Sequence, residues 1–189
     1  MKAVIKRVGP CTIRKKRNHF QSLVWAIVGQ QVSAAAAKTI FERLKDSFAE
    51  PAISAEALAQ RSREQLCEIG LTRPKADYLL CLAEMVNSRK LKLNELSRKS
   101  DQQVIEELTR VKGIGTWTAQ VFLIFSLGRL DVFPVDDIAL QNAIRKNFDL
   151  GNDVSKQDFL ELAESWAPYR SIASWYLWRT IHLDRDEAS

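Results

Sequence analysis

The chain has 189 residues, of which 46% are hydrophobic, enough to bury the core of one large domain or two smaller lobes. No apolar run approaches the roughly 20 residues of a membrane span, and no secretory signal is expected at the N-terminus. The three cysteines, at positions 11, 67 and 81, lack the spacing of a zinc or iron–sulfur site. A reduced, intracellular setting without a membrane therefore suits the sequence best.

The net charge is +5, and the excess is concentrated at the N-terminus. Seven cations lie within the first 17 residues, ahead of any acidic residue: Lys2, Lys6, Arg7, Arg14, Lys15, Lys16 and Arg17. Such an arm can neutralise phosphates of a nucleic acid. A solvated, partly frayed terminus accounts for the same residues equally well, so the charge alone leaves both interpretations open.

Helical periodicity dominates the rest of the chain. The stripe Phe20, Leu23, Val24, Ile27 and Val28 predicts the first long helix, and Ser33 is placed to cap the next. Further helices are predicted at residues 62–70, 74–86, 100–111, 117–127, 138–148, 159–166 and 170–182. Ser62 with Gln65 and Ser100 with Gln103 form capping-box patterns, and Gly128 is placed to end the helix at 117–127. The only plausible extended piece is "DVFPV", where Pro134 excludes a central strand. We therefore predict an all-α fold of eight to ten short helices.

The stretch "RVKGIGTW", from Arg110 to Trp117, separates two of these helices by a very short turn. Gly113 and Gly115 lack a Cβ and can both adopt positive φ, so they permit such a turn, and Thr116 can cap the helix that follows. The backbone N–H groups exposed there, with Lys112 beside them, suit a phosphate. An ordinary turn between two helices, ended by a glycine, explains the pattern equally well.

Two adjacent carboxylates, Asp136 and Asp137, stand just before the helix predicted at residues 138–148. One of them is placed to cap that helix, whose dipole favours an ionised carboxylate. If Asp136 is the cap, Asp137 lies in the first turn and can project into a cleft as an anion. The alternative is that both carboxylates serve only as caps.

The segment from Leu108 to Asp137 resembles the hairpin and aspartate signature of the helix-hairpin-helix DNA glycosylases. The nearest branch is the 3-methyladenine DNA glycosylase II group, which acts on alkylated bases. Three further segments resemble this family in order and spacing: "FQSLVWAIVGQQVS", "LTRPKADYLLCLAE" and "WAPYRSIASWYLWR". The resemblance implies a two-lobed helical fold with a cleft between the lobes. One lobe would span residues 19–130 and include the hairpin at about 104–127, and the other would combine residues 1–18 and 131–189.

The resemblance also implies a reaction, hydrolysis of the bond between a damaged base and deoxyribose in double-stranded DNA. The catalytic residue would be Asp137, because a fixed carboxylate stabilises the positive charge that develops on the sugar. The damaged base would leave the duplex to enter a pocket walled by Trp117 and Trp178. Gln31 would be the wedge, the side chain that fills the gap in the duplex. Phosphate would be bound by Lys112, Gly113, Ile114, Gly115 and Thr116.

Strand-cutting relatives carry a lysine two positions after the second hairpin glycine, and this chain has Trp117 there. The resemblance therefore implies a monofunctional enzyme that leaves an abasic site. Carbonyl groups of the hairpin, at Thr109, Val111 and Gly113, can hold a monovalent cation in this family; no divalent metal and no organic cofactor are expected. A pocket aromatic of some relatives is matched by Val121, which leaves the lesion range open.

Two other functions stay open from the sequence. One is glycosylase activity on another lesion, such as uracil, hypoxanthine or an oxidised purine. The other is a DNA-binding helical module that uses the hairpin without catalysis. In each case the expected partner is DNA inside the cell, and a monomer suffices.

Overall fold

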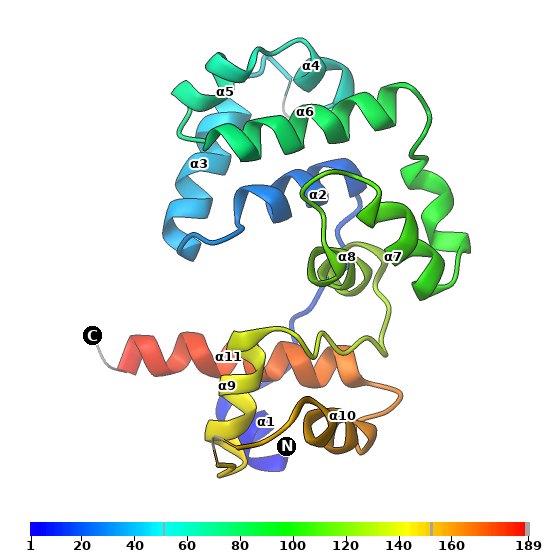
Figure 1. Ribbon diagram of the computed structural model, residues 1–189. Coiled ribbons are helices and arrows are strands. Elements are labelled where there is room, and N and C mark those ends of the chain that lie inside the picture. Colours follow the sequence, from blue (N-terminus) through cyan, green and yellow to red (C-terminus); the bar gives the residue numbers. More distant parts are fainter. Residues whose placement is uncertain (51, 152, 188–189) are drawn as a thin grey trace. The chain divides into compact units, whose positions relative to one another are not determined.

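The computed structural model describes residues 1–50, 52–151 and 153–187, and it is helical, with no strand in these ranges (Figure 1). The chain divides into two compact units. Residues 16–127 form one unit, and residues 1–15 together with residues 128–189 form the other. The sequence predicted this first unit with both of its boundaries three residues later, at 19 and 130 instead of 16 and 127.

The unit of residues 16–127 consists of seven α-helices, a 3-10 helix and a π-helix. The elements are α2 (His19–Val28), α3 (Ala34–Asp46), α4 (Ala55–Ala59), α5 (Arg63–Glu68), α6 (Arg73–Asn87), η1 (Leu93–Arg98), α7 (Asp101–Thr109), α8 (Thr116–Phe122) and the π-helix η2 (Leu123–Leu127). The apolar stripe predicted for α2 is wholly buried, and α2 packs against α3, α6 and α8 (Figure 1). This helix is therefore the centre of the unit.

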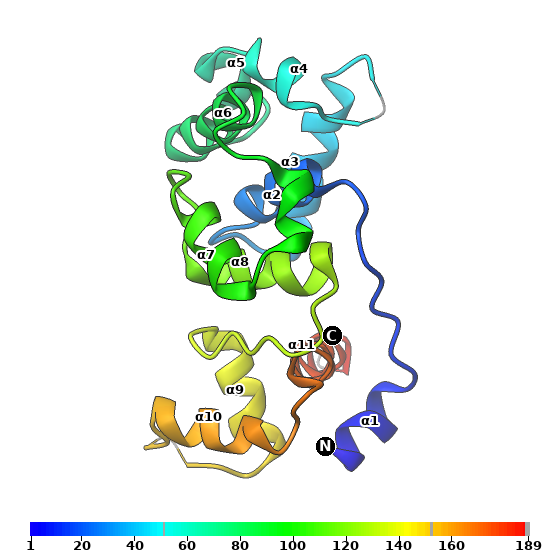
Figure 2. The same ribbon diagram turned by 90° about the vertical axis from the view of Figure 1, so that its right-hand side faces the viewer.

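The second unit contains four helices: α1 (Lys2–Val8), α9 (Ile138–Asn147), α10 (Lys156–Glu164) and α11 (Arg170–Glu187). Its core joins Phe133 and Val135, which precede α9, to Leu140, Ile144 and Leu177 of the helices. Helix α11 packs against both α9 and α1 (Figure 2). The "DVFPV" segment is not extended throughout as predicted, because Asp131 lies in a bend and Val135 in a turn; its buried apolar residues anchor the chain just ahead of α9.

The helix starts follow the side-chain caps read from the sequence. Ser33 accepts a hydrogen bond from Ala36 N–H, and both predicted capping boxes, at Ser62 with Gln65 and at Ser100 with Gln103, are present. Each cap satisfies a backbone N–H that the helix itself leaves without a partner. The positions of these helices were therefore predictable from local chemistry.

The expected number of helices was wrong: the described residues form eleven α-helices, not eight to ten. Short helices such as α4 and α5, of five and six residues, are too brief to show a full apolar period. The interpretation of the N-terminus as a frayed arm was also wrong for its first part. Residues 2–8 form α1, in which Val4 is buried and Arg7 pairs with Asp184 and Glu187 at 2.7 and 2.8 Å.

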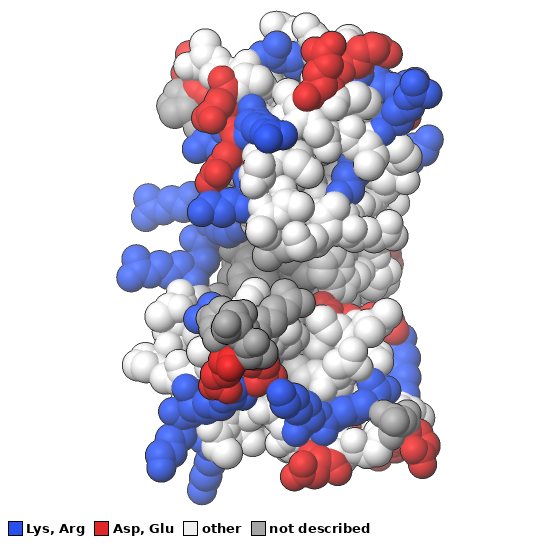
Figure 3. Space-filling view, turned by 90° about the vertical axis from the view of Figure 1, so that its left-hand side faces the viewer, with Lys and Arg blue, Asp and Glu red and all other residues white. Residues whose placement is uncertain are grey.

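The rest of the basic arm is extended and exposed. Lys16 is held by its backbone N–H, which donates to Phe125 O at 2.9 Å, and by its ammonium group, 5.6 Å from the centre of the Trp25 ring. Arg14, Lys15 and Arg17 are exposed. Figure 3 shows Lys and Arg side chains at the surface of each unit, with groups of Asp and Glu among them. In the described part of the chain, no helix is long and apolar enough to cross a bilayer.

An ion pair fixes the start of α11 to the chain that leads into α9. Arg170 donates from Nε and Nη2 to the two carboxylate oxygens of Asp131, at 2.7 and 2.8 Å, and its backbone N–H also approaches Asp131. These hydrogen bonds from Arg170 lower the pKa of the Asp131 carboxyl below its ordinary value. The ionised pair therefore stabilises the fold above about pH 4 and loses that contribution as the pH falls through the lowered pKa.

We expect Asp131→Asn to reduce the free energy of unfolding at pH 7 by about 1 kcal/mol, since the pair is partly exposed. The difference between variant and wild type should shrink as the pH falls below about 4, and it should vanish once the pH is below the lowered pKa of Asp131. Urea unfolding across this pH range measures the effect, with Asp153→Asn as an exposed control. A difference that stays constant with pH would show that the Asp131 charge contributes nothing.

Candidate active site

The predicted site residues fall into two groups, one in each compact unit. Asp137 and Trp178 belong to the unit that contains α9 and α11. The hairpin, Gln31 and Trp117 belong to the unit of residues 16–127. Each group is built by its own elements.

Asp137 is the residue from which α9 begins. Its Oδ1 accepts a hydrogen bond from the Leu140 backbone N–H at 2.7 Å, and its Oδ2 accepts one from Trp178 Nε1–H at 3.3 Å. The side chain is 8% exposed. The start of a helix favours an anion at this point, because backbone N–H dipoles point toward it. The two hydrogen bonds therefore fix an acidic group in one orientation at the surface of its unit.

The expectation that Asp136 caps the helix was wrong. The cap is Asp137, and Asp136 is exposed, 2.6 Å from Lys156 Nζ. Val135 is buried in the core, and a turn closed by the Asp137 N–H to Pro134 O hydrogen bond at 3.0 Å brings Asp137 to the cap position. Capping uses one oxygen of Asp137, whereas a carboxylate can accept about four hydrogen bonds. A cap is thus compatible with a second role.

Trp178 is the aromatic residue that the structure brings to Asp137. It lies on α11, is partly buried, and packs against the core that contains Leu140 and Leu177. The other aromatic residues of α11 are placed differently: Trp175 and Tyr176 are buried, and Tyr176 Oη donates to Gly9 O at 3.1 Å. Of these three side chains, only that of Trp178 contacts the carboxylate.

The hairpin between α7 and α8 is tight because of Gly113, which has φ +88°. A Cβ added at this glycine would lie 2.1 Å from Cγ of Tyr78 on α6, so the backbone here lies flat against an aromatic ring. Ile114 is 4% exposed and fills the space beneath the turn. Only glycine satisfies both the backbone conformation and the contact with Tyr78.

Three details of the predicted hairpin were wrong. Gly115 has φ −95° and no atom within 4 Å of an added Cβ, so it does not need the freedom of glycine. Thr116 is the first residue of α8, and its side chain does not cap the helix. The Ile114 N–H donates to Val111 O at 3.0 Å within the turn, which removes it from the groups available to a ligand. The groups left at this end of α8 are the N–H groups of Gly113, Gly115 and Thr116, with exposed Lys112 beside them.

Gln30 and Gln31 follow α2, and their side chains differ in contacts and exposure. Gln30 donates from Nε2 to Gly113 O at 2.8 Å and lies 3.4 Å from Thr118 Oγ1, so it braces the hairpin. Gln31 is exposed and has φ +54°, a left-handed conformation that is uncommon for a residue other than glycine or asparagine. Strain of this kind collects at functional positions. The exposed glutamine is therefore the one available to a partner.

Trp117 stands in the first turn of α8 and is 37% exposed, which is high for a tryptophan. Val121, one turn further along the helix, is partly buried. The hairpin carbonyl groups include that of Gly113, which accepts from Gln30, and that of Val111, which accepts from Ile114. A carbonyl oxygen has two lone pairs, so one hydrogen bond does not exhaust the capacity of either group as an acceptor. Within the described ranges no cluster of His, Cys, Asp and Glu is placed to bind a metal ion.

One family model matches a range that includes every predicted site residue except Trp178. The model of the HhH-GPD superfamily of base excision DNA repair proteins matches residues 24–168. The chain belongs to this superfamily. DNA-3-methyladenine glycosylase 1 of Schizosaccharomyces pombe is 35% identical to this HhH-GPD protein over 191 residues, covering 96% of this chain and 82% of the relative.

Two solved structures are similar to this HhH-GPD protein over nearly its whole length. Schizosaccharomyces pombe 3-methyladenine DNA glycosylase in complex with abasic DNA has a TM-score of 0.85 and 34% identity, covering 95% of this chain and 89% of the other. DNA-3-methyladenine glycosidase of Bacillus halodurans has a TM-score of 0.81 and 38% identity, covering 94% and 82%. The family and the all-α fold indicated by the sequence are confirmed.

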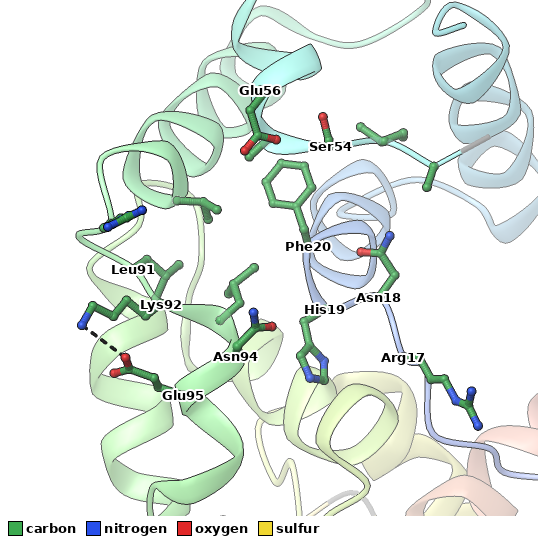
Figure 4. A pocket seen from close by; sticks show the side chains of 16 residues that line it. Arg17, Asn18, His19, Phe20, Ser54, Glu56, Leu91, Lys92, Asn94 and Glu95 are labelled. Atoms are coloured by element: carbon green, nitrogen blue, oxygen red, sulfur yellow. Dashed lines mark ion pairs between the residues drawn. The ribbon is translucent and has the colours of Figure 1, made fainter. Parts of the chain in front are cut away.

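A cavity of about 900 Å³ lies elsewhere in the unit of residues 16–127 of this HhH-GPD protein (Figure 4). It is bounded by the start of α2, the segment before α4, the end of α6 and η1. Phe20 forms one wall, and the Lys92–Glu95 ion pair lies on another side. None of the predicted site residues lines this cavity.

Two contacts at the site of this HhH-GPD protein were not predicted from the sequence. They are the hydrogen bond between Trp178 and Asp137 and the packing of Tyr78 on Gly113. Both join residues more than 30 positions apart, and periodicity reports only neighbours on one helix face. The one available signal for Tyr78 is its place on α6 near the buried stripe, which does not specify a partner.

Proposed function

We propose that this protein is a DNA glycosylase that hydrolyses the N-glycosidic bond of alkylated bases of the 3-methyladenine type in double-stranded DNA. The observation that carries the proposal is the Asp137 carboxylate, held at the start of α9 and hydrogen-bonded to Trp178 within a chain that belongs to the HhH-GPD superfamily. The named relatives act on 3-methyladenine. We expect the protein to work as a monomer on DNA inside the cell.

The proposed role of Asp137 follows from the position at which positive charge develops during the reaction. As the bond to the base breaks, the deoxyribose gains oxocarbenium character and becomes positive. Asp137 is already oriented by Leu140 N–H and Trp178 Nε1–H, so it stabilises this charge without having to reorganise. The carboxylate also orients a water molecule for attack on the sugar carbon. The carboxylate takes no covalent part in this reaction.

The hairpin and the α2–α3 turn supply DNA binding. The N–H groups of Gly113, Gly115 and Thr116 face a phosphate without any base preference, and the ammonium group of Lys112 adds a charge there. The carbonyl oxygens of Thr109, Val111 and Gly113 would hold a monovalent cation, which would add positive charge at the phosphate-binding turn. Gln31 enters the duplex as the wedge and offsets the few kcal/mol lost when a base leaves the stack.

Trp117 and Trp178 provide the walls for the everted base. Alkylation often leaves a purine cationic, and an indole face attracts a cation as well as stacking on it. Undamaged purines are neutral and lack this contribution. The same charge weakens the bond to the sugar, so binding and reactivity favour the same substrates.

A panel of duplexes tests the substrate class. Each carries one lesion: an N-methylated purine, uracil, hypoxanthine or 8-oxoguanine, and the free base is measured by chromatography under single-turnover conditions. We expect release of methylated purines at a rate at least tenfold above that of the other bases. Preferential release of another base would replace the alkylated-base proposal, and tight DNA binding without release of any base would favour a non-catalytic module.

The second expected property is the absence of strand cleavage. Because Trp117 has no amine, no Schiff base can form at this position, and the product is an abasic site. Incubation with substrate duplex and sodium borohydride should give no covalent protein–DNA adduct. A borohydride-dependent adduct that migrates with the protein would contradict the monofunctional mechanism.

A further inference from the structure

Helix α6 carries two side chains that contact the elements assigned to DNA binding. Lys75 is 8% exposed, and its ammonium group donates to the Val28 carbonyl at 2.8 Å. Val28 is the last residue of α2, and the turn that presents Gln31 begins directly after it. Tyr78 lies three residues further along α6 and packs on Gly113 of the hairpin.

The contact of Lys75 with α2 has a clear physical effect. The last carbonyl groups of a helix have no partner within the helix, and a cation at this end also complements the helix dipole. Burial of the ammonium group lowers the pKa of Lys75, which reflects the cost of removing it from water. An exposed lysine would avoid this cost. We therefore attribute the buried position of Lys75 to its hydrogen bond with the Val28 carbonyl at the end of α2.

The turn after α2 needs such support. Helices commonly end with a glycine in the left-handed conformation, but Gly29 here has φ −75°. The left-handed residue is Gln31, with φ +54°, which stores strain in the wedge itself. A fixed end of α2 at Val28 keeps this strained turn from relaxing into another arrangement.

The wedge turn is also joined to the hairpin. Gln30, next to the wedge, donates to Gly113 O at 2.8 Å, and Gly113 lies against Tyr78 of α6. Lys75 and Tyr78 both lie on α6. From this helix they contact the end of α2 and the hairpin, the two elements assigned to DNA binding. The position of Gln31 relative to the hairpin is set by three contacts: Lys75 to Val28, Gln30 to Gly113, and Tyr78 to Gly113.

We propose that Lys75 is a positioning residue for base eversion: by fixing the end of α2 it holds the Gln31 wedge in register with the phosphate-binding hairpin. This inference rests on the proposed function, in that it assumes that both elements contact DNA. It assigns Lys75 no contact with DNA and no part in bond cleavage. Loss of the contact should leave the hairpin able to bind the backbone while the wedge no longer enters the duplex in a defined position.

The test separates eversion from binding and from catalysis. A duplex with an abasic-site analogue carries 2-aminopurine opposite the gap, and the fluorescence change on protein binding reports entry of the wedge. Lys75→Met keeps the length of the side chain but removes the charge and the donor. We expect it to lose at least 80% of the wild-type fluorescence change, and we expect the same loss for Gln31→Ala. The Kd for undamaged duplex should change less than about threefold.

Lys90→Met is the matched control, because Lys90 is exposed and follows the end of the same helix. It should behave as wild type. If Lys75→Met does not fold, Lys75→Gln replaces it, since glutamine is polar but too short to make the same contact, and the same loss of signal is expected. Fluorescence unchanged from wild type, or binding and fluorescence reduced in equal proportion, would overturn the proposal. The readout needs no base release, so a failure of the proposed catalysis appears separately in the lesion panel.

Discussion

Asp137→Asn is expected to reduce the single-turnover rate of base release by at least 10²–10³-fold, the loss seen when one preorganised electrostatic group is removed from an active site. Asparagine is as good a helix cap as aspartate, so its carbonyl oxygen still accepts the Leu140 N–H. The variant should therefore fold, with a melting temperature within a few degrees of wild type, and bind duplex DNA with nearly unchanged affinity. Chromatography of the free base measures the rate, and calorimetry measures the stability.

Asp136→Asn is the matched control for this substitution. Asp136 is the neighbouring carboxylate, but it is exposed and paired with Lys156 at the surface. We expect its rate of base release to stay within about twofold of wild type, because a surface ion pair contributes little. Equal losses in the two variants would show that net charge near α9, and not the carboxylate at position 137, controls the reaction.

Gly113→Ala is expected to have the second largest effect, on stability and DNA binding together. The new methyl group would lie 2.1 Å from Cγ of Tyr78, and alanine is strained at φ +88°. We expect a loss of roughly 2–4 kcal/mol in the free energy of unfolding, typical of overpacking combined with backbone strain. The affinity for undamaged duplex should fall at least tenfold, because the turn that presents the N–H groups is displaced.

Two further variants show whether the Tyr78 contact is responsible. Gly115→Ala should change the free energy of unfolding by no more than about 0.5 kcal/mol, since φ there is −95° and the space is open. Adding Tyr78→Ala to Gly113→Ala should recover part of the lost stability, because the methyl group then has room, and a double-mutant cycle measures this coupling. Additive losses in the cycle would argue against the close packing of the hairpin on α6.

Local chemistry in the sequence predicted the secondary structure well. Ser33, Ser62 and Ser100 cap the helices they were expected to cap, and Gly128 ends its helix with φ +72°. Each of these predictions depends on residues within four positions of one another, where backbone geometry leaves few choices. The all-α fold and the helix-hairpin-helix followed from the same signals.

Predictions that depended on tertiary packing were less accurate. The choice between Asp136 and Asp137 as the cap was decided by burial of Val135 in the core, which no local pattern reports. The difference between Gly113 and Gly115 was decided by Tyr78, 35 residues away from Gly113 in the sequence. Likewise, the buried hydrogen bond from Lys75 to Val28 O joins residues 47 positions apart, and no local pattern predicts it.

The most direct test of the role of Asp137 is to measure whether the protein prefers DNA that carries a positively charged analogue of the sugar. Two duplexes are compared, one with a cationic pyrrolidine in place of a deoxyribose and one with a neutral tetrahydrofuran of similar shape. Because an anion about 4 Å from a cation gains several kcal/mol in a partly desolvated site, the wild-type protein should bind the cationic duplex at least tenfold more tightly. The preference should disappear in Asp137→Asn; an equal preference in both proteins, or none in wild type, would contradict the role assigned to Asp137.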